Sequence, residues 1–361
     1  MNVLVIHPSL NDCGGSERVC IRIIEALKEK GYNVTLGTFE KTNWEKVSKF
    51  FDNVKKPDVE FVRPKFFGAS AYEELLNFYA LSLRISNNYE AIVVSCASPW
   101  LFCPNSKKTI IYMNIAPVNH IKGFRRAYIS PYVFLQKRAF KKGNTVILTN
   151  SSFSSKIIKE VYSLRPMVVY PPVDVDKFQP TLKKENLVVS VGRFDPYKGY
   201  EKLIMAFSNV KFGKCAILGN IYDYVSLKYF KKLKHLVNYL KLDDKVELIV
   251  NCSFAKLRHF LSKAKVYVHS ALFEFFGISV VEAMASGCVP IVHKSGGPYT
   301  DIIARGTYGF AFENVRELAD NINLLLEDET LFRDFSYKAI GRSKFFSKKS
   351  FKEKFLSLAA L

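Results

Sequence analysis

The amino-acid sequence predicts an α/β protein with two lobes, each built around a parallel β-sheet. Short apolar segments of strand length alternate with amphipathic segments of helical periodicity along the whole chain, which is typical of parallel α/β layers. The 361 residues are enough for two domains with a core in each. A stretch with two adjacent prolines, VVYPPVDVDKFQP at 168–180, divides this pattern into two halves.

Apolar runs in each half predict the strands. In the first half we expect strands at Val3–Ile6, Val34–Thr38, Ala91–Cys96, Thr109–Tyr112 and Thr145–Thr149. In the second half we expect them at Leu187–Val191, Cys215–Leu218, Val246–Ile249, Val266–His269 and Val289–Val292. Amphipathic helices are expected between the strands, for example at Glu17–Lys30, Tyr200–Asn209 and Val315–Asp328.

The two prolines also predict the domain boundary. Pro171 and Pro172 lack a backbone donor and bias their neighbours toward extended geometry, so a hinge is expected near residue 172. The first lobe would then span 1–171 and the second 172–340. The chain end, 341–361, is rich in Lys and Phe and is expected to form a helix that packs back on the first lobe.

Composition excludes several classes of protein. Apolar residues make up 48% of the chain, which excludes general disorder. The longest apolar runs are strand-sized, far shorter than the about 20 residues that span a membrane. The opening MNVLVIHPSL lacks the basic region of a signal peptide. The seven cysteines are odd in number and include no CxxC pair, which predicts free thiols, no zinc cluster and a cytoplasmic location.

The net charge of +20 is unevenly distributed. Between Glu90 and Glu160 the sequence contains no Asp or Glu, whereas Lys and Arg recur throughout. Such a surface attracts an anionic partner, which could be a membrane, a nucleic acid or a polyphosphate, although a solvated basic face explains the charge equally well. The basic residues lack a recognition helix, an RNA-binding sheet motif and a zinc signature, so we expect no nucleic-acid partner.

Gly14 and Gly15 lie in the segment NDCGGSE at 11–17, between the first expected strand and the first expected helix. Glycines there let a ligand approach the backbone, and the helix start offers N–H groups and a positive dipole end to a phosphate. An ordinary strand–helix turn fits the two glycines equally well, because neither GxGxxG nor the Walker pattern is present.

Arg193 and Lys198 lie in the segment GRFDPYKG at 192–199, directly after an expected strand. The carboxyl edge of an α/β sheet is where ligands bind. Arg can hold a phosphate bidentately and Lys adds a point charge, so the two could bind a pyrophosphate and stabilise it as a leaving group. Two solvated surface cations would give the same sequence.

The most informative motif is SALFEFFGISVVEAMASG at 270–287. Gly277 marks a turn, and a helix that begins at Ile278 would aim its positive end at the upper edge of the sheet. Glu274 precedes this helix and Glu282 lies in its second turn. Carboxylates accept hydrogen bonds from vicinal hydroxyls, so one could bind a sugar and the other a ribose. In a helix as apolar as VVEAMA, an ionised Glu282 needs a partner.

These segments together resemble family 4 retaining glycosyltransferases of the GT-B fold, in which two Rossmann-like lobes with parallel sheets face each other across a cleft. The matching segments occur in the family's order over nearly the whole chain. They are GGSE, TNSSFSS at 149–155, YPPVD at the hinge, VGRFDPYKG, EFFGISVVE and VPIVHKSGGP. The segment at 269–302, HSALFEFFGISVVEAMASGCVPIVHKSGGPYTDI, is most similar to mannosyltransferases that extend lipid-linked oligosaccharides on the cytosolic membrane face.

The resemblance implies a site and its ligands. In the second lobe the implied donor-binding residues are Arg193, Lys198, Glu274, Phe276, Gly277, Ile278 and Glu282. Among them, Glu274 would bind the hexose hydroxyls and Glu282 the ribose, while Gly14 and Gly15 would approach the phosphates from the first lobe. The donor would be a nucleotide sugar of the GDP-mannose or UDP-glucose type, and the acceptor a lipid-linked saccharide or another glycan. No cofactor and no metal ion are implied.

The sequence departs from the family in the first lobe. Relatives often carry a histidine in a Tyr-x-His-x-Pro-like segment, which here reads YMNIAP at 112–117 with Asn114 in that position. Asn114 can exchange hydrogen bonds with a sugar but does not titrate near neutral pH, and His120 is the alternative. At the hinge, Asp174 and Asp176 form a DxD pair, for which a turn role is expected rather than metal binding.

The basic, aromatic stretch His120–Lys142 leads to a hypothesis about the acceptor. This face could meet an anionic membrane that carries a lipid-phosphate acceptor, because each Lys or Arg near such a surface adds about 1 kcal/mol. The same stretch could instead pack into the first lobe. A sugar-nucleotide epimerase of the same two-lobe fold is the alternative enzyme class.

Overall fold

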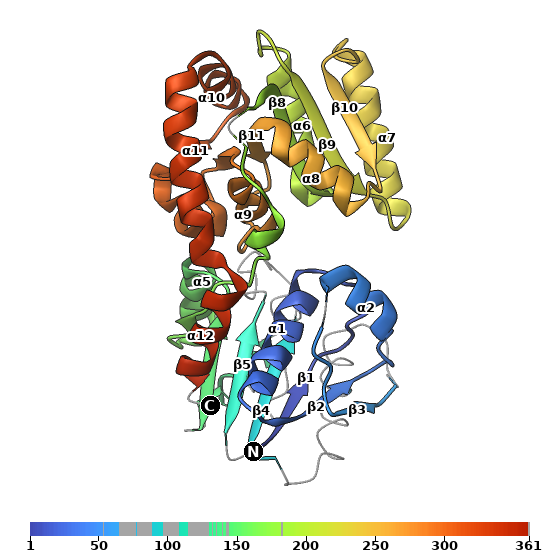
Figure 1. Ribbon diagram of the computed structural model, residues 1–361, viewed down its shortest axis with the longest axis vertical. Coiled ribbons are helices and arrows are strands. Elements are labelled where there is room, and N and C mark those ends of the chain that lie inside the picture. The colour runs from blue at the N-terminus through green and yellow to red at the C-terminus, as the bar shows by residue number, and fades with distance from the viewer. Residues whose placement is uncertain are drawn as a thin grey trace. The chain divides into compact units, whose positions relative to one another are not determined.

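The computed structural model describes residues 1–52, 54–64, 89–96, 108–114, 144–181 and 183–359, together with residue 77 and most of 130–141. The chain forms two compact units, which are Met1–Pro172 with Lys348–Leu361, and Val173–Ser347 (Figure 1). Within the described part of the chain, every helix is too short or too polar to cross a membrane.

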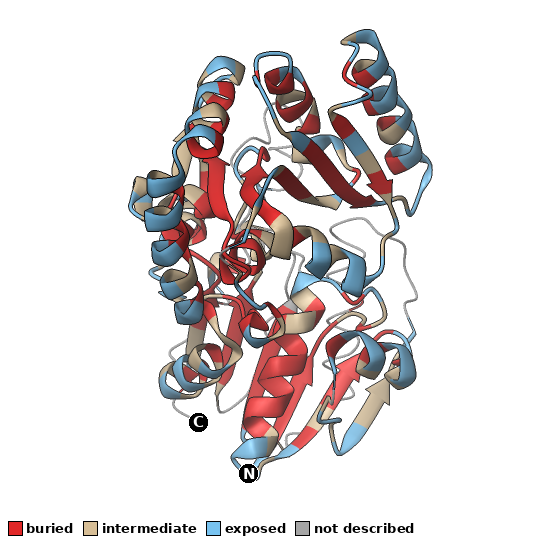
Figure 2. Cartoon of the chain, turned by 45° about the horizontal axis from the view of Figure 1, so that its top comes forward, coloured by how far each residue is buried: buried red, intermediate tan, exposed pale blue. Residues whose placement is uncertain are grey.

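The first unit is built on a seven-stranded sheet with the order β3-β2-β1-β4-β5-β6-β7. All of its paired strands run parallel. The strands are β1 (Asn2–Ile6), β2 (Asn33–Thr38), β3 (Val59–Val62), β4 (Ala91–Cys96), β5 (Thr109–Met113), β6 (Thr145–Thr149) and β7 (Met167–Val168). The central strands β1 and β5 are buried on both faces, which their unbroken apolar sequences allow (Figure 2).

Four helices of the first unit are described: α1 (Gly15–Glu29), α2 (Trp44–Phe51), α5 (Ser152–Tyr162) and α12 (Lys348–Ala359). Helix α1 connects β1 to β2 and contributes its apolar face to the core. Phe351 and Phe355 of α12 join the same core. Lys352 of α12 forms ion pairs with Glu25 and Glu29 of α1 at 3.1 and 2.8 Å, so the end of the chain is fixed to the first unit.

The second unit contains a six-stranded parallel sheet with the order β10-β9-β8-β11-β12-β13. Its strands are β8 (Glu185–Arg193), β9 (Lys214–Asn220), β10 (Val246–Val250), β11 (Ala264–His269), β12 (Val289–His293) and β13 (Phe310–Phe312). Its helices are α6 (Tyr200–Phe207), α7 (Tyr224–Tyr239), α8 (Phe254–Lys263), α9 (Ile278–Ala285), α10 (Val315–Glu327) and α11 (Glu329–Ser343). Sheet and helices share one apolar core.

Every strand expected from the sequence is present, with bounds that differ by at most a few residues. The strands that were not expected, β3, β7 and β13, contain four, two and three residues and lie at sheet edges. Such short edge strands carry too few apolar residues for a periodic pattern. At the hinge, Asp174 precedes a short turn and forms an ion pair with Lys177 at 3.5 Å, which agrees with the expected turn role.

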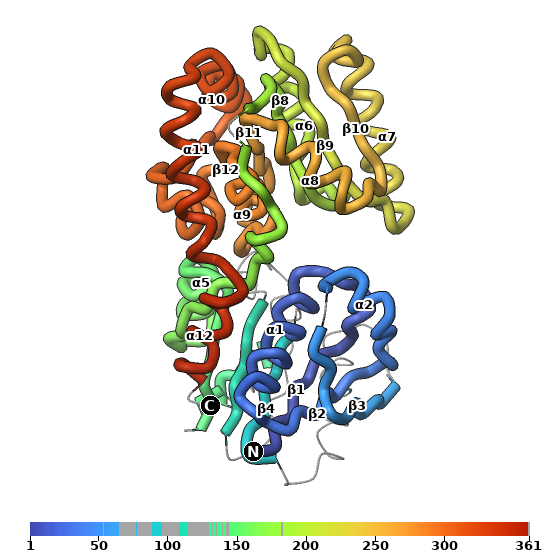
Figure 3. The backbone as a smooth tube through the Cα atoms, in the orientation of Figure 1, coloured from blue at the N-terminus to red at the C-terminus, as the bar shows by residue number. Residues whose placement is uncertain are grey.

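The helix expected at 341–361 is present as α12 and belongs to the first unit, but it begins later than expected. Helix α11 continues to Ser343, a 3-10 turn follows at Lys344–Phe346, and α12 begins at Lys348 (Figure 3). The helix is interrupted here because residues 346 and 347 pair with Val173 of the hinge. The carbonyl of Phe346 accepts a hydrogen bond from the N–H of Val173 at 2.9 Å, and extended Ser347 bridges to Val173.

Candidate functional site

The loops that carry the motifs of the second half leave the second sheet at one edge. Strands β8, β11 and β12 are neighbours and run parallel, so the loops after them share the carboxyl edge. The chain runs from β8 outward to β9 and β10 and then returns to β11 on the other side of β8. The strand order therefore reverses between β8 and β11, and ligands of α/β sheets bind at such a point.

Lys198 is held at this boundary by the turn that follows β8. Asp195 caps the turn Pro196–Lys198 by accepting a backbone N–H at 3.0 Å. Ser270, the first residue after β11, donates its hydroxyl to the carbonyl of Lys198 at 2.7 Å. The aliphatic stem of Lys198 passes over Gly192, where an added Cβ would lie 3.4 Å from Lys198 Cε. The ammonium group is therefore directed from β8 toward the loop after β11.

Lys198 and Glu274 form a direct ion pair. Lys198 Nζ lies 2.5 Å from Glu274 Oε2, and the two side chains are 22% and 23% exposed. Although burial raises the pKa of Glu274, Lys198 and His269 lower it more, so this pKa lies well below its ordinary value. The pair places a cation that can bind phosphate beside an anion that can accept hydrogen bonds from sugar hydroxyls.

His269 is a third member of this group, and sequence reasoning did not single it out. It ends β11, its side chain is 4% exposed, and its Nε2 lies 3.5 Å from Glu274 Oε2. Among the described residues, none forms a hydrogen bond with this nitrogen. Burial and the charge of Lys198 lower the pKa of His269 against the opposing effect of Glu274, so the ring is neutral at neutral pH. The only signal in the sequence was a polar residue that closes an apolar strand.

The loop after β12 fixes the backbone at Glu274. The N–H of Gly297 donates to the carbonyl of Glu274 at 2.8 Å. A Cβ on Gly297 would lie 2.1 Å from the carbonyl oxygen of Phe275, and one on Gly296 would lie 2.4 Å from that of Glu274. Only glycine permits two backbones to approach this closely. The segment SGGPYTD is therefore part of the site's support rather than an isolated turn.

Helix α9 begins beside the ion pair. Gly277 has a φ of +96°, which favours glycine, and the helix starts at Ile278 as predicted. An added Cβ on Gly277 would lie 3.8 Å from Glu274 Cγ. Phe276 is buried and packs against Phe346 with 5.5 Å between ring centroids, which anchors the turn in the core. The positive end of the α9 dipole is thus close to the ion pair, where it favours an anion.

Glu282 lies in the second turn of α9 and is 8% exposed. It is near Tyr267 of β11, whose hydroxyl donates to the hydroxyl of Ser279 at 2.8 Å. Burial raises the pKa of Tyr267, and the charges of Glu282 and Glu274 raise it further. Both carboxylates of the Glu-(seven residues)-Glu motif therefore act electrostatically on the same tyrosine.

Arg193 has a different partner from Lys198. It is exposed at the end of β8, and its guanidinium lies 5.5 Å from the ring centroid of Tyr222, in the turn before α7. The hydroxyl of Tyr222 donates to Asp195 at 3.4 Å. The two cations that the sequence assigns to one diphosphate therefore share the sheet edge, but Arg193 is directed toward β9 and Lys198 toward β11.

A comparison with known protein families identifies the second unit. The family described as "Glycosyl transferases group 1" matches residues 173–342, which contain all of the loops above. The match covers nearly all of the second unit and a little less than half of the chain. The motifs quoted from the sequence after residue 172 fall within it.

Several proteins with similar sequences carry the name of a mannosyltransferase. A mouse protein named GDP-Man:Man(3)GlcNAc(2)-PP-Dol alpha-1,2-mannosyltransferase is 28% identical over 98% of this chain and 85% of its own length. Proteins of the same name from Dictyostelium discoideum and Xenopus laevis are 27% and 32% identical over 58% and 59% of this chain. The chain spans 46% and 48% of their lengths, which is about half.

Solved structures confirm the fold class. The structure of Anabaena HepE in complex with UDP aligns with this chain over 100% of both chains. The TM-score is 0.79 and the sequence identity is 18%. That of WaaG, a glycosyltransferase of lipopolysaccharide biosynthesis, has a TM-score of 0.73 and 15% identity over 99% of both chains. The GT-B fold class predicted from the sequence is therefore confirmed.

The first-unit residues named from the sequence lie at the start of α1 and after β5. Gly14 and Gly15 are exposed, and Gly15 begins α1. The N–H of Gly14 donates to Glu17 Oε2 at 2.7 Å, so this amide is used within the unit. Asn114 follows β5, and its carbonyl accepts a hydrogen bond from the side chain of Asn150 at 2.6 Å. Contact of Gly14, Gly15 or Asn114 with a donor stays a prediction.

Two further sequence predictions fall outside the described residues. His120, the alternative to Asn114, is one of them. The hypothesis of a membrane-binding face rests on the stretch 120–142, of which 120–129 is not described. Both stay predictions.

Proposed function

We propose that the chain transfers a hexose from a nucleotide donor, mannose from GDP-mannose, to a lipid-linked saccharide with retention of the anomeric configuration. The observation that carries this proposal is the Lys198–Glu274 ion pair at the β8–β11 boundary, beside the start of α9. The names of the mannosyltransferase relatives support the choice of donor and acceptor. A UDP-sugar is the alternative donor.

When the donor binds, the two side chains of the ion pair would separate and contact different parts of the ligand. Lys198 would turn to the diphosphate, and Glu274 would accept hydrogen bonds from hydroxyls of the hexose. A charged hydrogen bond of this kind contributes about 1.5–3 kcal/mol. Because the side chains already neutralise each other, the free protein keeps both charges partly buried without an unpaired ion.

The chemistry would then be electrostatic. Negative charge develops on the diphosphate as the bond to the hexose breaks, and Lys198 and the positive end of α9 would stabilise it. Arg193 would add a second cation after turning from Tyr222. The acceptor hydroxyl would attack from the face that the diphosphate leaves, which retains the configuration. This scheme uses no metal ion and no cofactor, and undiminished turnover in the presence of a chelator is the expected result.

A ligand panel tests the donor. Thermal unfolding is measured with GDP, UDP and ADP, and a ligand at 100 times its dissociation constant stabilises the protein by about 2.7 kcal/mol. We expect the largest shift with GDP, and no shift with GDP in Lys198→Ala. Lys211→Ala is the matched control, because Lys211 forms an exposed ion pair with Glu327 at 2.9 Å in the same unit. A shift of equal size in Lys198→Ala would contradict the site.

A turnover assay separates transfer from epimerisation. Labelled GDP-mannose is incubated with and without a lipid-linked saccharide, and the nucleotide and sugar products are separated. Transfer predicts that the hexose leaves the nucleotide only when the acceptor is present. Appearance of an epimeric nucleotide sugar without acceptor would support the alternative enzyme class instead.

We also propose that the acceptor is presented at the cytosolic face of an anionic membrane. The supporting observations are the net charge of +20 and the acid-free sequence between Glu90 and Glu160. Co-sedimentation with vesicles should require anionic lipid and weaken with salt. Binding that does not depend on anionic lipid would contradict this proposal.

A further inference from the structure

His269 ends β11 with a buried nitrogen that forms no hydrogen bond with any described residue. Its side chain is 4% exposed, and Nε2 lies 3.5 Å from Glu274 Oε2, at the outer limit of a hydrogen bond. The ring therefore faces the Lys198–Glu274 ion pair without being bound to it. Buried polar atoms in folded proteins nearly always have a partner, because an unpaired one costs stability.

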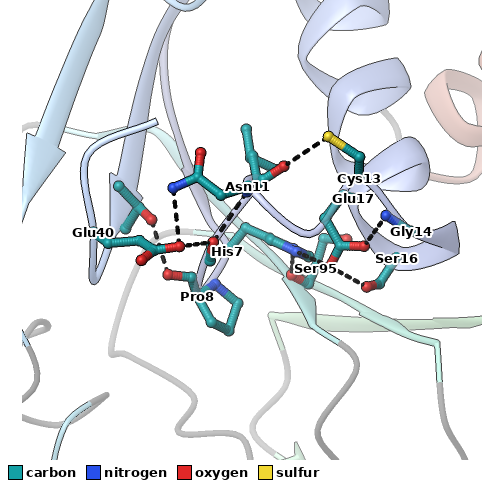
Figure 4. A network of polar contacts seen from close by, with 12 residues as sticks. His7, Pro8, Asn11, Cys13, Gly14, Ser16, Glu17, Glu40 and Ser95 are labelled. Atoms are coloured by element: carbon teal, nitrogen blue, oxygen red, sulfur yellow. Dashed lines mark hydrogen bonds and ion pairs between the residues drawn. The ribbon is translucent and has the colours of Figure 1, made fainter. Parts of the chain in front are cut away.

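A buried histidine of the first unit provides a contrast. His7 directly follows β1, where its Nδ1 contacts the carbonyl oxygen of Ser95 and its Nε2 lies 3.3 Å from Glu17 Oε1 (Figure 4). Both ring nitrogens of His7 are thus engaged within the unit, and a structural role accounts for them. Nε2 of His269 has no such structural role.

Lys198 and His269 face the same oxygen atom of Glu274. Lys198 Nζ lies 2.5 Å from Oε2, and His269 Nε2 lies 3.5 Å from it. Within the described part of the chain, no third basic side chain is within ion-pair distance of this carboxylate. The shorter contact satisfies the carboxylate in the free protein, and the histidine is the remaining neighbour that can replace it.

Two charged side chains among the described residues act on His269. Lys198 comes from the turn after β8, and Glu274 comes from the loop after β11. Strand β12 places a valine opposite His269, and the first turn of α9 carries no charge. The phenols of Tyr200 and Tyr267, which Glu274 also affects, stay neutral because burial raises their pKa. The charge of His269 therefore depends on where the ammonium group of Lys198 lies.

Donor binding would change these contacts. Under the proposed function, Lys198 turns to the diphosphate, whose negative charge then neutralises the ammonium group. Glu274 would lose its partner while it remains partly buried, and a buried carboxylate without a partner is unfavourable. An N–H on Nε2 of His269 can donate to the oxygen that the lysine leaves, since the two atoms are already neighbours.

We propose that His269 is a positioning residue, which replaces Lys198 as the partner of Glu274 when the donor binds and keeps this carboxylate in place for the hexose. The inference rests on the proposed function, because it assumes that a diphosphate draws Lys198 away. His269 does not touch the reacting atoms in this role. With the opposing ammonium group neutralised and the carboxylate still present, the histidine becomes easier to protonate, so donor binding takes up a proton from the solvent.

The first test counts protons during donor binding. Isothermal titration calorimetry of the full chain with GDP-mannose is repeated in buffers of different ionisation enthalpy, from pH 5.5 to pH 8. Both ends of this diphosphate are esterified, so the ligand itself does not titrate near neutral pH. The wild type should take up part of a proton, and His269→Gln, which does not titrate, should take up less. Equal proton uptake in the two proteins overturns the proposal.

The second test is a double-mutant cycle on the affinity for GDP, which contains the diphosphate but no hexose. His269→Leu leaves Glu274 without a partner in the complex, so it should weaken GDP binding about tenfold or more. In the Glu274→Gln background the same exchange should change the affinity little, because no carboxylate needs a partner. His269→Gln keeps a donor N–H and should bind GDP more tightly than His269→Leu. Equal losses in both backgrounds overturn the proposal, since a purely structural role predicts them.

Urea denaturation separates this role from a structural one. His269→Leu removes a buried atom that has no hydrogen bond, so the free variant should be as stable as the wild type. If this variant does not fold, the proton count with His269→Gln decides. His235→Leu is the matched control, because His235 is exposed on α7 of the same unit, and it should bind GDP normally.

The outcomes separate this inference from the proposed function. Wild type that binds neither GDP-mannose nor UDP-glucose overturns both. Normal GDP affinity in the wild type and in folded His269→Leu overturns only the inference.

Discussion

Each unit places a buried histidine against a glutamate at the carboxyl end of a central strand, yet the two histidines differ in charge. His7 follows β1 and lies 3.3 Å from Glu17, and its pKa is raised to about 10. His269 ends β11 and lies 3.5 Å from Glu274, and its pKa is lowered. Distance and burial are alike, so neither explains the difference.

The difference lies in a third neighbouring side chain. Lys198 already neutralises Glu274, and its ammonium group also opposes a positive charge on His269. The described residues that act on His7 are Glu17 and Cys20, and both favour its charged form. The same His–Glu contact is therefore found beside Cys20, which raises the pKa of His7, and beside Lys198, which lowers the pKa of His269. Neighbours other than the glutamate set the difference in charge. Changing one charged side chain in either unit should shift the protonation state of its histidine toward that of the histidine in the other unit.

The largest expected effect follows from removing the charges of the second unit. Lys198→Ala and Glu274→Ala should each lower kcat/KM by about 10²–10³, in the range found when a group that stabilises developing charge is lost. Steady-state turnover of GDP-mannose with a lipid-linked acceptor measures this. Lys211→Ala should retain normal turnover. Near-normal activity in both site variants would falsify the assignment of the ion pair.

A comparison of glycines tests how rigidly each site is held. Gly297→Ala brings a Cβ to 2.1 Å from a backbone oxygen, so we expect a loss of about 2–4 kcal/mol in the free energy of unfolding. Gly14→Ala meets only the side-chain oxygen of Glu17, at 2.7 Å, and should cost about 1 kcal/mol. Urea denaturation measures both. The control Gly341→Ala in α11 has no atom within 4 Å and should not destabilise. Equal losses at 14 and 297 would contradict this ranking.

A sharper test removes the lysine that lies beside the histidine and the glutamate of the second unit. Lys198→Met removes the cation and leaves Glu274 facing His269, so the pKa of His269 should rise above its wild-type value. Proton–carbon NMR of the histidine ring over a pH series measures the change. Glu274→Gln is the matched variant, in which the group that raises this pKa is lost, and His269 should stay neutral. An unchanged pKa in Lys198→Met would show that burial alone sets the state of His269.

The last test concerns the pH dependence of stability, where the two histidines act in opposite directions. The pKa of His7 is about 10 in the folded state and 6.5 in its ordinary state, so its contribution is complete below pH 6.5 and is lost as the pH rises toward 10. His269 has a lowered pKa, so its contribution is present above pH 6.5 and is lost as the pH falls.

Urea denaturation of wild type and His7→Gln/Glu17→Gln at pH 6 and pH 9 tests the first of these effects. The stability advantage of the wild type should be greater at pH 6 than at pH 9. Glu17 does not interfere, because its pKa of about 2 keeps it ionised throughout. Cys20 also faces His7, so Cys20→Ser is the control. An equal advantage at both pH values would contradict a charged His7.

Most of the fold could be predicted because buried parallel strands are unbroken apolar runs. The expected strands at Ala91–Cys96 and Thr145–Thr149 match β4 and β6 to the residue. Edge strands such as β13 are too short to show a pattern. The break at 344–347 depends on pairing with Val173, far away in the sequence, so the composition of the chain end gave no sign of it.

The candidate site was predictable in its parts but not in its pairings. Strand-end position and residue type singled out Lys198 and Glu274, yet their ion pair joins residues 76 positions apart. Arg193 was grouped with Lys198 because they are close in sequence, whereas the structure directs it to Tyr222. His7 and His269 were overlooked because a lone histidine after an apolar strand has no spacing to recognise. The charge of such a residue depends on its contacts with a neighbouring strand or helix, which the sequence does not show.

The close approach of Gly296 and Gly297 to the backbone of Glu274 and Phe275 has a consequence for how donor preference can change. Main-chain contacts set the path of the loop at 274, and these do not depend on which side chain position 274 carries. Under the proposed function, an exchange at that position would alter the chemistry offered to the sugar while the surrounding peptide keeps its course. We therefore expect that one substitution at position 274 could change the sugar preference without rebuilding the loop.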